Sequence, residues 1–300
     1  MNLSTVIPKS ERPRNVLATR ARLGEGPVWD EQQQRLHWVD IYNRRIHTYD
    51  PAKTSASFIE VDSVVSGLFI DDAEHLIIAE ENGLSRLNLL THQREPIVSI
   101  EADRPNNRLN DVRCDCQGRL WIGTMNNDEQ PQASLYRFDP NGSLHKMETD
   151  LSISNGLGWN PDQSAFYLTD SPRQLIYAYR FEAESGTIGD RTVLIDLTAE
   201  TFFPDGLTID SEGCIWSAMW NGGCVIRFNP DGQEIDRIAL PVPLVTSCTF
   251  GGPDLADLYI TTASAGMSQA ELKQYHEAGD LFCLPTSVRG LPSERCSLRC

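Results

Sequence analysis

The 300-residue sequence lacks the features of a membrane or nucleic-acid-binding protein. No apolar run is long enough to cross a membrane as a helix, and residues 1–13 are polar and lack the apolar core of a signal peptide. Lysine and arginine number 26 against 42 acidic residues, so the formal net charge is −16. Phosphate binding needs clustered positive charge. We therefore expect a cytoplasmic protein with no membrane or nucleic-acid partner.

Several common catalytic and metal-binding motifs are also missing. The six histidines form no His-x-x-x-His pair, and the eight cysteines form no Cys-x-x-Cys pair. Neither a Gly-x-Ser-x-Gly motif nor a phosphate-binding glycine loop occurs. A zincin, a Cys-x-x-Cys zinc site and a serine hydrolase are therefore unsupported. Without a secretion signal we expect reduced thiols, and Cys296 and Cys300 lie in a tail to which the sequence gives no role.

A five-residue pattern is present six times. It begins with a polar residue, usually has a small second residue, and alternates into a hydrophobic fifth position. Its copies begin 41, 44, 45, 50 and 41 residues apart, a period typical of β-propeller blades. The copies are residues 25–29 (EGPVW), 66–70 (SGLFI), 110–114 (NDVRC), 155–159 (NGLGW), 205–209 (DGLTI) and 246–250 (TSCTF).

Further strand-like segments follow each copy. After turn residues comes a short apolar run, such as residues 215–218 (IWSA), and then a third run, such as residues 224–228 (CVIRF). A fourth strand is indicated more weakly, for example by residues 234–240. The sequence predicts an all-β fold, a six-bladed β-propeller with four antiparallel strands per blade. A β-sandwich with chance similarity between its segments is the alternative.

One propeller accounts for nearly the whole chain. We expect a flexible lead over residues 1–13, a single propeller domain over residues 14–290, and a tail over residues 291–300. Residues 15–20 read as a strand ahead of the first repeat. We expect this strand to close the last blade, because that pairing would remove an unpaired edge. The polar outer segments favour a monomer.

The first positions of the six copies predict a ring of oxygen-bearing side chains. In a propeller the innermost strand of each blade lines the central channel, so equivalent positions lie around one axis. Glu25, Asn155 and Asp205 offer two carboxylates and one amide carbonyl, which suit Ca²⁺, Mg²⁺ or Mn²⁺ and also accept Zn²⁺. A cation would offset the repulsion between the carboxylates. Taken singly, each residue could be an ordinary turn or solvated residue. The other ring members are Ser66, Asn110 and Thr246.

Two polar stretches interrupt the repeat. The first, residues 101–110, places Arg108 two residues before Asn110, on the same strand face if the backbone is extended. Arg108 could then hold a polyhydroxylated or anionic substrate, and a surface arginine is the alternative. The second, residues 125–133 (MNNDEQPQA), is a candidate binding loop or lid that contains Asp128 and Glu129.

Seven short motifs lie in or beside the repeats: residues 23–29 (LGEGPVW), 106–111 (NNRLND), 123–125 (GTM), 153–157 (ISNGL), 204–207 (PDGL), 221–223 (NGG) and 246–248 (TSC). Together they resemble the SMP-30/gluconolactonase/LRE-like family over about residues 16–285. The resemblance implies one divalent cation at the channel mouth, held by Glu25, Asn155 and Asp205. It also implies substrate contacts at Arg108 and Asn110. A further family contact, a glutamate, falls on Asp128, which is shorter and has Glu129 next to it.

The resemblance implies hydrolysis of a small sugar lactone to its aldonic acid. The cation, with Ca²⁺ or Zn²⁺ the first choices and Mn²⁺ or Mg²⁺ also fitting, would polarise the lactone carbonyl. Asp205 is our candidate general base, which would take a proton from the attacking water. Two other classes stay open: a metal-dependent esterase or organophosphate hydrolase of the same propeller type, and a non-enzymatic calcium-binding regulatory protein.

Overall fold

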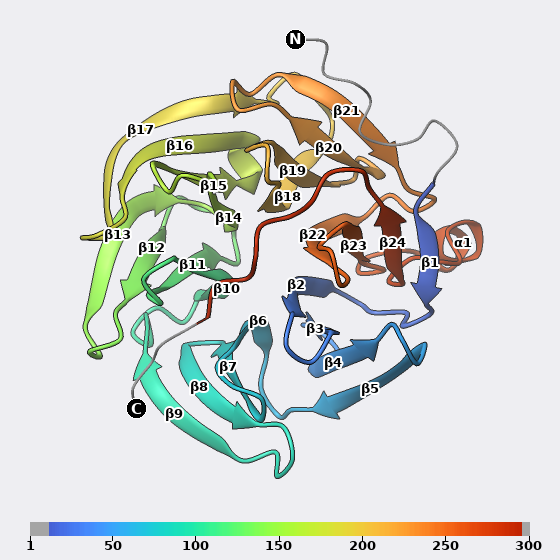
Figure 1. Ribbon diagram of the computed structural model, residues 1–300, viewed down its shortest axis with the longest axis horizontal. Helices are drawn as coiled ribbons and strands as arrows, with labels where there is room; N and C mark the ends of the chain where they lie inside the picture. The colour runs from blue at the N-terminus through green and yellow to red at the C-terminus, as the bar shows by residue number, and fades with distance from the viewer. Residues whose placement is uncertain (1–11, 296–300) are drawn as a thin grey trace.

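A computed structural model describes residues 12–295, whose strands form six four-stranded antiparallel sheets around a central channel (Figure 1). The six-bladed propeller expected from the repeats is confirmed. From the channel outward, the first five blades are β2 (Gly24–Asp30), β3 (Arg35–Asp40), β4 (Arg45–Asp50) and β5 (Ser55–Glu60); β6 (Val65–Ile70), β7 (His75–Glu80), β8 (Gly83–Asn88) and β9 (Arg94–Ser99); β10 (Asn107–Cys114), β11 (Leu120–Asn126), β12 (Ala133–Phe138) and β13 (Leu144–Leu151); β14 (Ser154–Trp159), β15 (Ala165–Asp170), β16 (Leu175–Glu182) and β17 (Thr187–Asp196); and β18 (Phe203–Ile209), β19 (Ile215–Trp220), β20 (Cys224–Phe228) and β21 (Glu234–Ala239).

The sixth blade joins the two ends of the chain. It consists of β22 (Val245–Gly251), β23 (Asp257–Thr262), β24 (Leu281–Pro285) and, outermost, β1 (Arg14–Leu17). Arg14 pairs with Cys283 and Leu17 pairs with Leu281, so the N-terminal strand closes the last blade as expected. The strand ends at Leu17 instead of continuing to residue 20, because Arg20 has a positive φ of 51° and turns the chain toward β2.

The hydrophobic core lies between adjacent blades, and large aromatic side chains fill it. Trp121 of the third blade lies with its ring centroid 5.0 Å from that of Phe166 in the fourth. Trp216 of the fifth blade meets Phe250 of the sixth edge-on at 5.5 Å. Both tryptophans are fully buried. This interdigitation fixes each blade against its neighbours and thereby holds the innermost strands in register around the channel.

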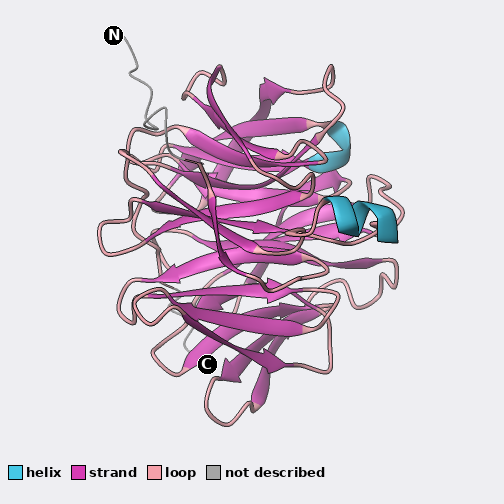
Figure 2. Ribbon diagram, turned by 90° about the vertical axis from the view of Figure 1, so that its right-hand side faces the viewer, coloured by secondary structure: helices cyan, strands magenta, loops and turns pink. Residues whose placement is uncertain are grey.

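The two short helices lie on the same face of the ring (Figure 2). The 3₁₀-helix η1 (Ser171–Arg173) follows β15, and α1 (Gln269–Gln274) lies between β23 and β24. A reciprocal pair of hydrogen bonds between Ser268 and Glu271 caps α1 at its N-terminus. Within residues 12–295, no helix is both long and apolar enough to cross a membrane.

The chain after β24 crosses the central channel (Figure 1). The amide of Gly290 donates to Leu255 O at 2.8 Å, Ser211 N donates to Arg289 O at 2.8 Å, and Ser293 N donates to Glu31 Oε1 at 2.8 Å. These contacts tie the segment to the sixth, fifth and first blades, so residues 291–295 of the expected tail pack onto the propeller. Residues 1–11 and Cys296 and Cys300 lie outside the described part, in which six cysteines are free thiols.

Candidate metal centre

Every innermost strand departs from regular pairing at the same place in the repeat. The registers shift between Glu25 and Val28, Asn155 and Leu157, and Pro204 and Leu207, and the other three innermost strands shift at equivalent positions. A β-bulge places an extra residue opposite one partner and redirects side chains next to it. The six bulges therefore account for the clustering of polar side chains from different blades at one end of the channel.

Three of the ring residues expected to hold a metal line one pocket of about 390 Å³. They are Glu25 on β2, Asn155 on β14 and Asp205 on β18. Asn155 Nδ2 donates a short hydrogen bond to Asp205 Oδ1 and a second one of 3.2 Å to Ser171 Oγ. Glu25 Oε2 accepts from Gly26 N at 3.0 Å. The arrangement brings two carboxylates and one amide oxygen together, as a hard cation requires.

Burial and mutual repulsion disfavour charge on these acids. The pKa of Glu25 is raised to about 8, first by burial and then by the nearby carboxylate of Asp111. The pKa of Asp205 is raised well above its ordinary value by burial, then by Glu25 and Asp111, although the hydrogen bond from Asn155 opposes the shift. A divalent cation among them would favour the charged forms. The donor set and its electrostatics therefore fit a cation.

The sequence analysis did not single out Asp111. It is the only large acidic side chain at the second position of the repeat, where the other blades have Gly26, Gly67, Gly156, Gly206 and Ser247. Burial raises its pKa, and the guanidinium of Arg113 partly offsets that rise. The departure from a small residue at this position was the signal available in the sequence.

Arg108 and Asn110 line the same pocket. Arg108 Nη1 donates to Asn110 Oδ1 at 3.0 Å and to Leu109 O at 2.8 Å, while Asn110 Nδ2 donates to Ser154 O at 3.0 Å. Burial lowers the pKa of Arg108, and Tyr42, Glu25 and Glu81 oppose this shift. The structure thus places a buried guanidinium beside the acidic cluster, held by hydrogen bonds to the strand that carries it.

The loop after β11 places its two acidic residues differently. Asp128 is exposed and accepts a hydrogen bond of 2.6 Å from Asn106 Nδ2, and it is absent from the residues that line the pocket. Glu129 lines the pocket and has a positive φ of 57°. Of the two alternatives that the sequence left open, the geometry favours Glu129 as the residue facing a ligand.

The two remaining ring residues join blades. Ser66 Oγ donates to Asn110 O at 3.0 Å, and Thr246 Oγ1 donates to Gly24 O at 2.6 Å. Neither residue lines the pocket. Their hydroxyls stitch neighbouring innermost strands together across the bulges.

The family model described as the SMP-30/gluconolactonase/LRE-like region matches residues 23–264. The chain belongs to this family. Pentonolactonase XacC of Haloferax volcanii is 38% identical over 291 residues, which cover 95% of this chain and 98% of that protein. Regucalcin of Gallus gallus is 36% identical over 281 residues, which cover 91% and 94%. A solved structure of a calcium-binding protein, regucalcin, from Agrobacterium tumefaciens gives a TM-score of 0.92 at 30% identity, covering 98% and 99% of the two chains.

An aromatic wall of this SMP-30/gluconolactonase-family pocket also escaped the sequence analysis. Tyr42 follows β3, Phe203 begins β18 and Trp220 ends β19, and all three line the pocket. They lie where strands meet loops, so each belongs to a different part of its repeat unit. No single repeat position could have indicated them together.

A second acidic cluster in the described part is compensated by an arginine. Asp210, Glu212 and Cys214 bring their ligand atoms within 4.8 Å of one another. However, Asp210 Oδ2 accepts from Arg227 Nη2 at 2.7 Å and from Trp216 Nε1 at 2.8 Å, and Glu212 Oε2 accepts from Arg227 Nη2 at 2.7 Å. Because this guanidinium already neutralises the carboxylates, we assign the cation to the channel pocket instead.

Proposed function

We propose that this protein is a sugar lactonase that uses a divalent cation held by Glu25, Asn155 and Asp205. The observation that carries the proposal is the convergence of Glu25 and Asp205 in one pocket with the guanidinium of Arg108. Acids crowded in this way need a cation to stay ionised at neutral pH. The name of the pentonolactonase relative supports a lactone as substrate.

The ligand set restricts the cation without fixing its identity. Carboxylate and amide oxygens suit Ca²⁺, Mg²⁺ and Mn²⁺ and accept Zn²⁺. The description of the Agrobacterium tumefaciens regucalcin as calcium-binding makes Ca²⁺ the first choice, with Zn²⁺ second. When bound, the cation supplies Lewis-acid polarisation of the lactone carbonyl.

Asp205 is the proposed general base. Its Oδ1 accepts the hydrogen bond from Asn155, so the orientation of the carboxylate is fixed before substrate arrives. Asp205 would take a proton from water as the water oxygen attacks the acyl carbon. The acyl–oxygen bond of the lactone then breaks, and the same proton is returned to the ring oxygen, which becomes a hydroxyl group. Atoms and charge balance, since one water is added across one ester bond.

Arg108, Asn110 and Glu129 are the proposed substrate contacts. A pocket of about 390 Å³ is at the small end of the range for ligand sites, in keeping with a single sugar ring. The guanidinium and amide can hydrogen-bond sugar hydroxyls on one side, and this positioning lowers part of the barrier. Asp128, the residue that the family resemblance indicated, keeps the weaker claim because it faces Asn106.

The aromatic wall supports a second candidate, a metal-dependent esterase or organophosphate hydrolase. Tyr42, Phe203 and Trp220 could pack against an aryl group. The buried Arg108 and Asn110 opposite them favour a polyhydroxylated substrate, so we place the lactone first.

The experiment is a rescue assay on chelator-treated protein. Acid release from a panel of pentono- and hexonolactones is measured after Ca²⁺, Zn²⁺, Mn²⁺ or Mg²⁺ is added back, with aryl esters and an organophosphate in parallel. We expect saturable, cation-dependent release from at least one lactone, above its spontaneous rate. Faster cation-dependent turnover of the aryl substrates would establish the second candidate instead. A folded protein that binds a cation and hydrolyses none of them would leave only the calcium-binding regulatory class.

A further inference from the structure

A second ring of residues lies three positions beyond the first along the innermost strands. Its members are the fourth residues of the six copies of the repeat. All six line a separate cavity of about 210 Å³, at the other end of these strands from the candidate metal centre. They are Val28, Phe69, Arg113, Gly158, Thr208 and Thr249.

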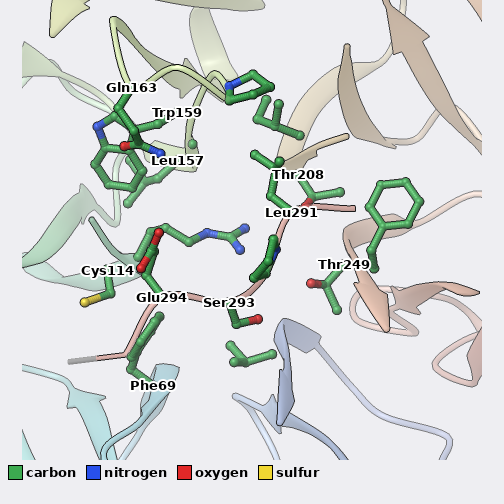
Figure 3. Close-up of a pocket in the computed structure, with 17 residues that line it drawn as sticks. Phe69, Cys114, Leu157, Trp159, Gln163, Thr208, Thr249, Leu291, Ser293 and Glu294 are labelled. Carbon is green, nitrogen blue, oxygen red and sulfur yellow. The ribbon is translucent and has the colours of Figure 1, made fainter. Parts of the chain in front are cut away.

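The C-terminal segment covers this cavity. Leu291, Ser293 and Glu294 line it, and Figure 3 shows them along one side of the cavity, beside Phe69 and Cys114. Burial raises the pKa of Glu294, and the carboxylates of Asp115 and Glu31 raise it further. The segment therefore encloses a space that is distinct from the pocket assigned to the lactone.

Arg113 brings unused hydrogen-bonding capacity to the cavity. A guanidinium has five N–H donors. Within residues 12–295, Arg113 makes one hydrogen bond, from Nη2 to Leu207 O at 2.8 Å, and its Nε is buried without an acceptor. Because the group can only donate, whatever satisfies it must carry acceptor oxygens.

Two hydroxyl groups face the same space. Thr208 and Thr249 are 8% and 4% exposed, and their hydroxyls make no hydrogen bond within the described part of the chain. Figure 3 shows both side chains at the cavity, on the side opposite Trp159. Each hydroxyl can donate to a ligand oxygen. Three polar groups from the third, fifth and sixth blades are thus available to one ligand.

The rest of the ring is apolar or absent. Val28 and Phe69 line the cavity from the first and second blades, and Leu157 and Ile209 line it beside them. Gly158 contributes no side chain, and a Cβ there would approach Leu207 Cδ1 and Ile209 Cγ1 at 3.0 Å. The cavity therefore has a polar side and an apolar side.

We propose that this cavity is a second ligand site that takes a small monocarboxylate, with its carboxylate at Arg113, Thr208 and Thr249 and its hydrocarbon part against Val28 and Phe69. The volume corresponds to about seven waters at ~30 Å³ each, which limits the ligand to a few carbon atoms. The inference stands independently of the lactonase proposal, because no residue of the metal centre takes part in it.

The surrounding charges select a monoanion over a dianion. Asp111 lies close enough to Arg113 for the guanidinium to offset part of the rise in the pKa of Asp111. Arg113 thus has only part of its charge available to a ligand. A second negative charge on an inorganic phosphate would meet Asp111 and Glu294 without a further cation among the lining residues.

The test is calorimetric titration of the metal-free full chain with butyrate, so that no cation can bind the probe. Butyramide, which has the same shape without the charge, and inorganic phosphate serve as comparison ligands. We expect butyrate to bind with a Kd on the order of 1 mM and both comparison ligands to bind at least about tenfold more weakly. Equal binding of butyrate and butyramide, or no binding of butyrate, would overturn the proposal.

Variants locate the binding. Arg113→Gln keeps a donor for Leu207 O and should weaken butyrate at least about tenfold, and Thr249→Val should weaken it a few-fold while keeping its shape. Arg113→Lys should restore part of the affinity. The matched control Arg44→Gln, on the exposed surface, should bind as the parent does. If Arg113→Gln does not fold, Thr249→Val and Thr208→Val decide the question. Parental affinity in the folded variants would show that butyrate binds elsewhere.

Discussion

Asn155 and Asp205, 50 residues apart on neighbouring blades, are joined by a hydrogen bond from the side-chain amide of Asn155 to the carboxylate of Asp205. The bond directs the amide nitrogen toward Asp205 and leaves the amide oxygen as the ligand atom. It also holds an acid whose pKa burial and neighbouring carboxylates raise well above the ordinary range. One contact between two strands thus organises both the proposed cation site and the proposed base.

Asp205→Ala should abolish most turnover, because it removes both a cation ligand and the proton acceptor. We expect kcat to fall by roughly 10²–10⁴, the usual contribution of a general base, or more where the cation is also lost. The assay is acid release with the best lactone at saturating cation. The exposed Asp231→Ala serves as the control and should keep parental activity. An active, folded Asp205→Ala would remove this residue from the chemistry.

Arg108→Ala should raise KM more than it weakens cation affinity. The guanidinium is proposed to bind substrate hydroxyls, while its loss leaves Glu25, Asn155 and Asp205 in place. Initial rates over a range of lactone concentrations give KM, and calorimetric titration with the cation gives its Kd. Arg108→Lys should recover part of the KM effect. Unchanged kinetics would show that Arg108 has only a structural role on β10.

The two acids of the loop after β11 should separate in a paired substitution. Glu129→Gln should raise KM, because Glu129 lines the pocket, and Asp128→Asn should leave KM within about twofold, because Asp128 is exposed and bonded to Asn106. Both variants conserve shape, so each controls for the other. The reverse order of effects would return the substrate contact to Asp128.

His47→Phe should reduce the loss of stability in acid. His47 is buried and stacks on Trp38 at 4.8 Å, its Nε2 has no partner, and burial lowers its pKa to about 4. The unfolded chain, with an ordinary pKa of about 6.5, takes up a proton that the folded chain refuses, so stability falls as the pH drops from about 6.5 to about 4. The full difference is at most about 3 kcal/mol.

The measurement is the free energy of unfolding in urea at several pH values. The variant should show a shallower decline below pH 6.5 than the parent, whereas the exposed His276→Gln should decline as the parent does. Parallel curves for His47→Phe and the parent would mean that this histidine is not held neutral by the fold.

The repeat made the innermost strands predictable, and with them the pocket. Positions equivalent in sequence had to be equivalent around an axis, so Glu25, Asn155 and Asp205 could be grouped before any geometry was known. The outermost strands were harder to foresee: β5 is almost wholly exposed and has no apolar alternation to reveal it. Its position depends on pairing with β4, which is a tertiary property.

Some residues of the site could not be assigned from local pattern. Glu129 and Asp128 are adjacent, and only the path of the loop decides which of them lines the pocket. Tyr42, Phe203 and Trp220 come from three separate strand ends. The C-terminal segment crosses the channel through backbone hydrogen bonds, such as that of Gly290 to Leu255 O, which have no sequence signature.

The central claim is that Glu25, Asn155 and Asp205 hold the cation that lactone hydrolysis needs. The most direct measurement is the cation content of dialysed protein, determined together with acid release on the same sample, for the parent, Glu25→Gln and the control Ser66→Ala. The account predicts about one tightly held cation per chain in the parent and in Ser66→Ala, and joint loss of cation and activity in Glu25→Gln. A folded Glu25→Gln that retains both would contradict it.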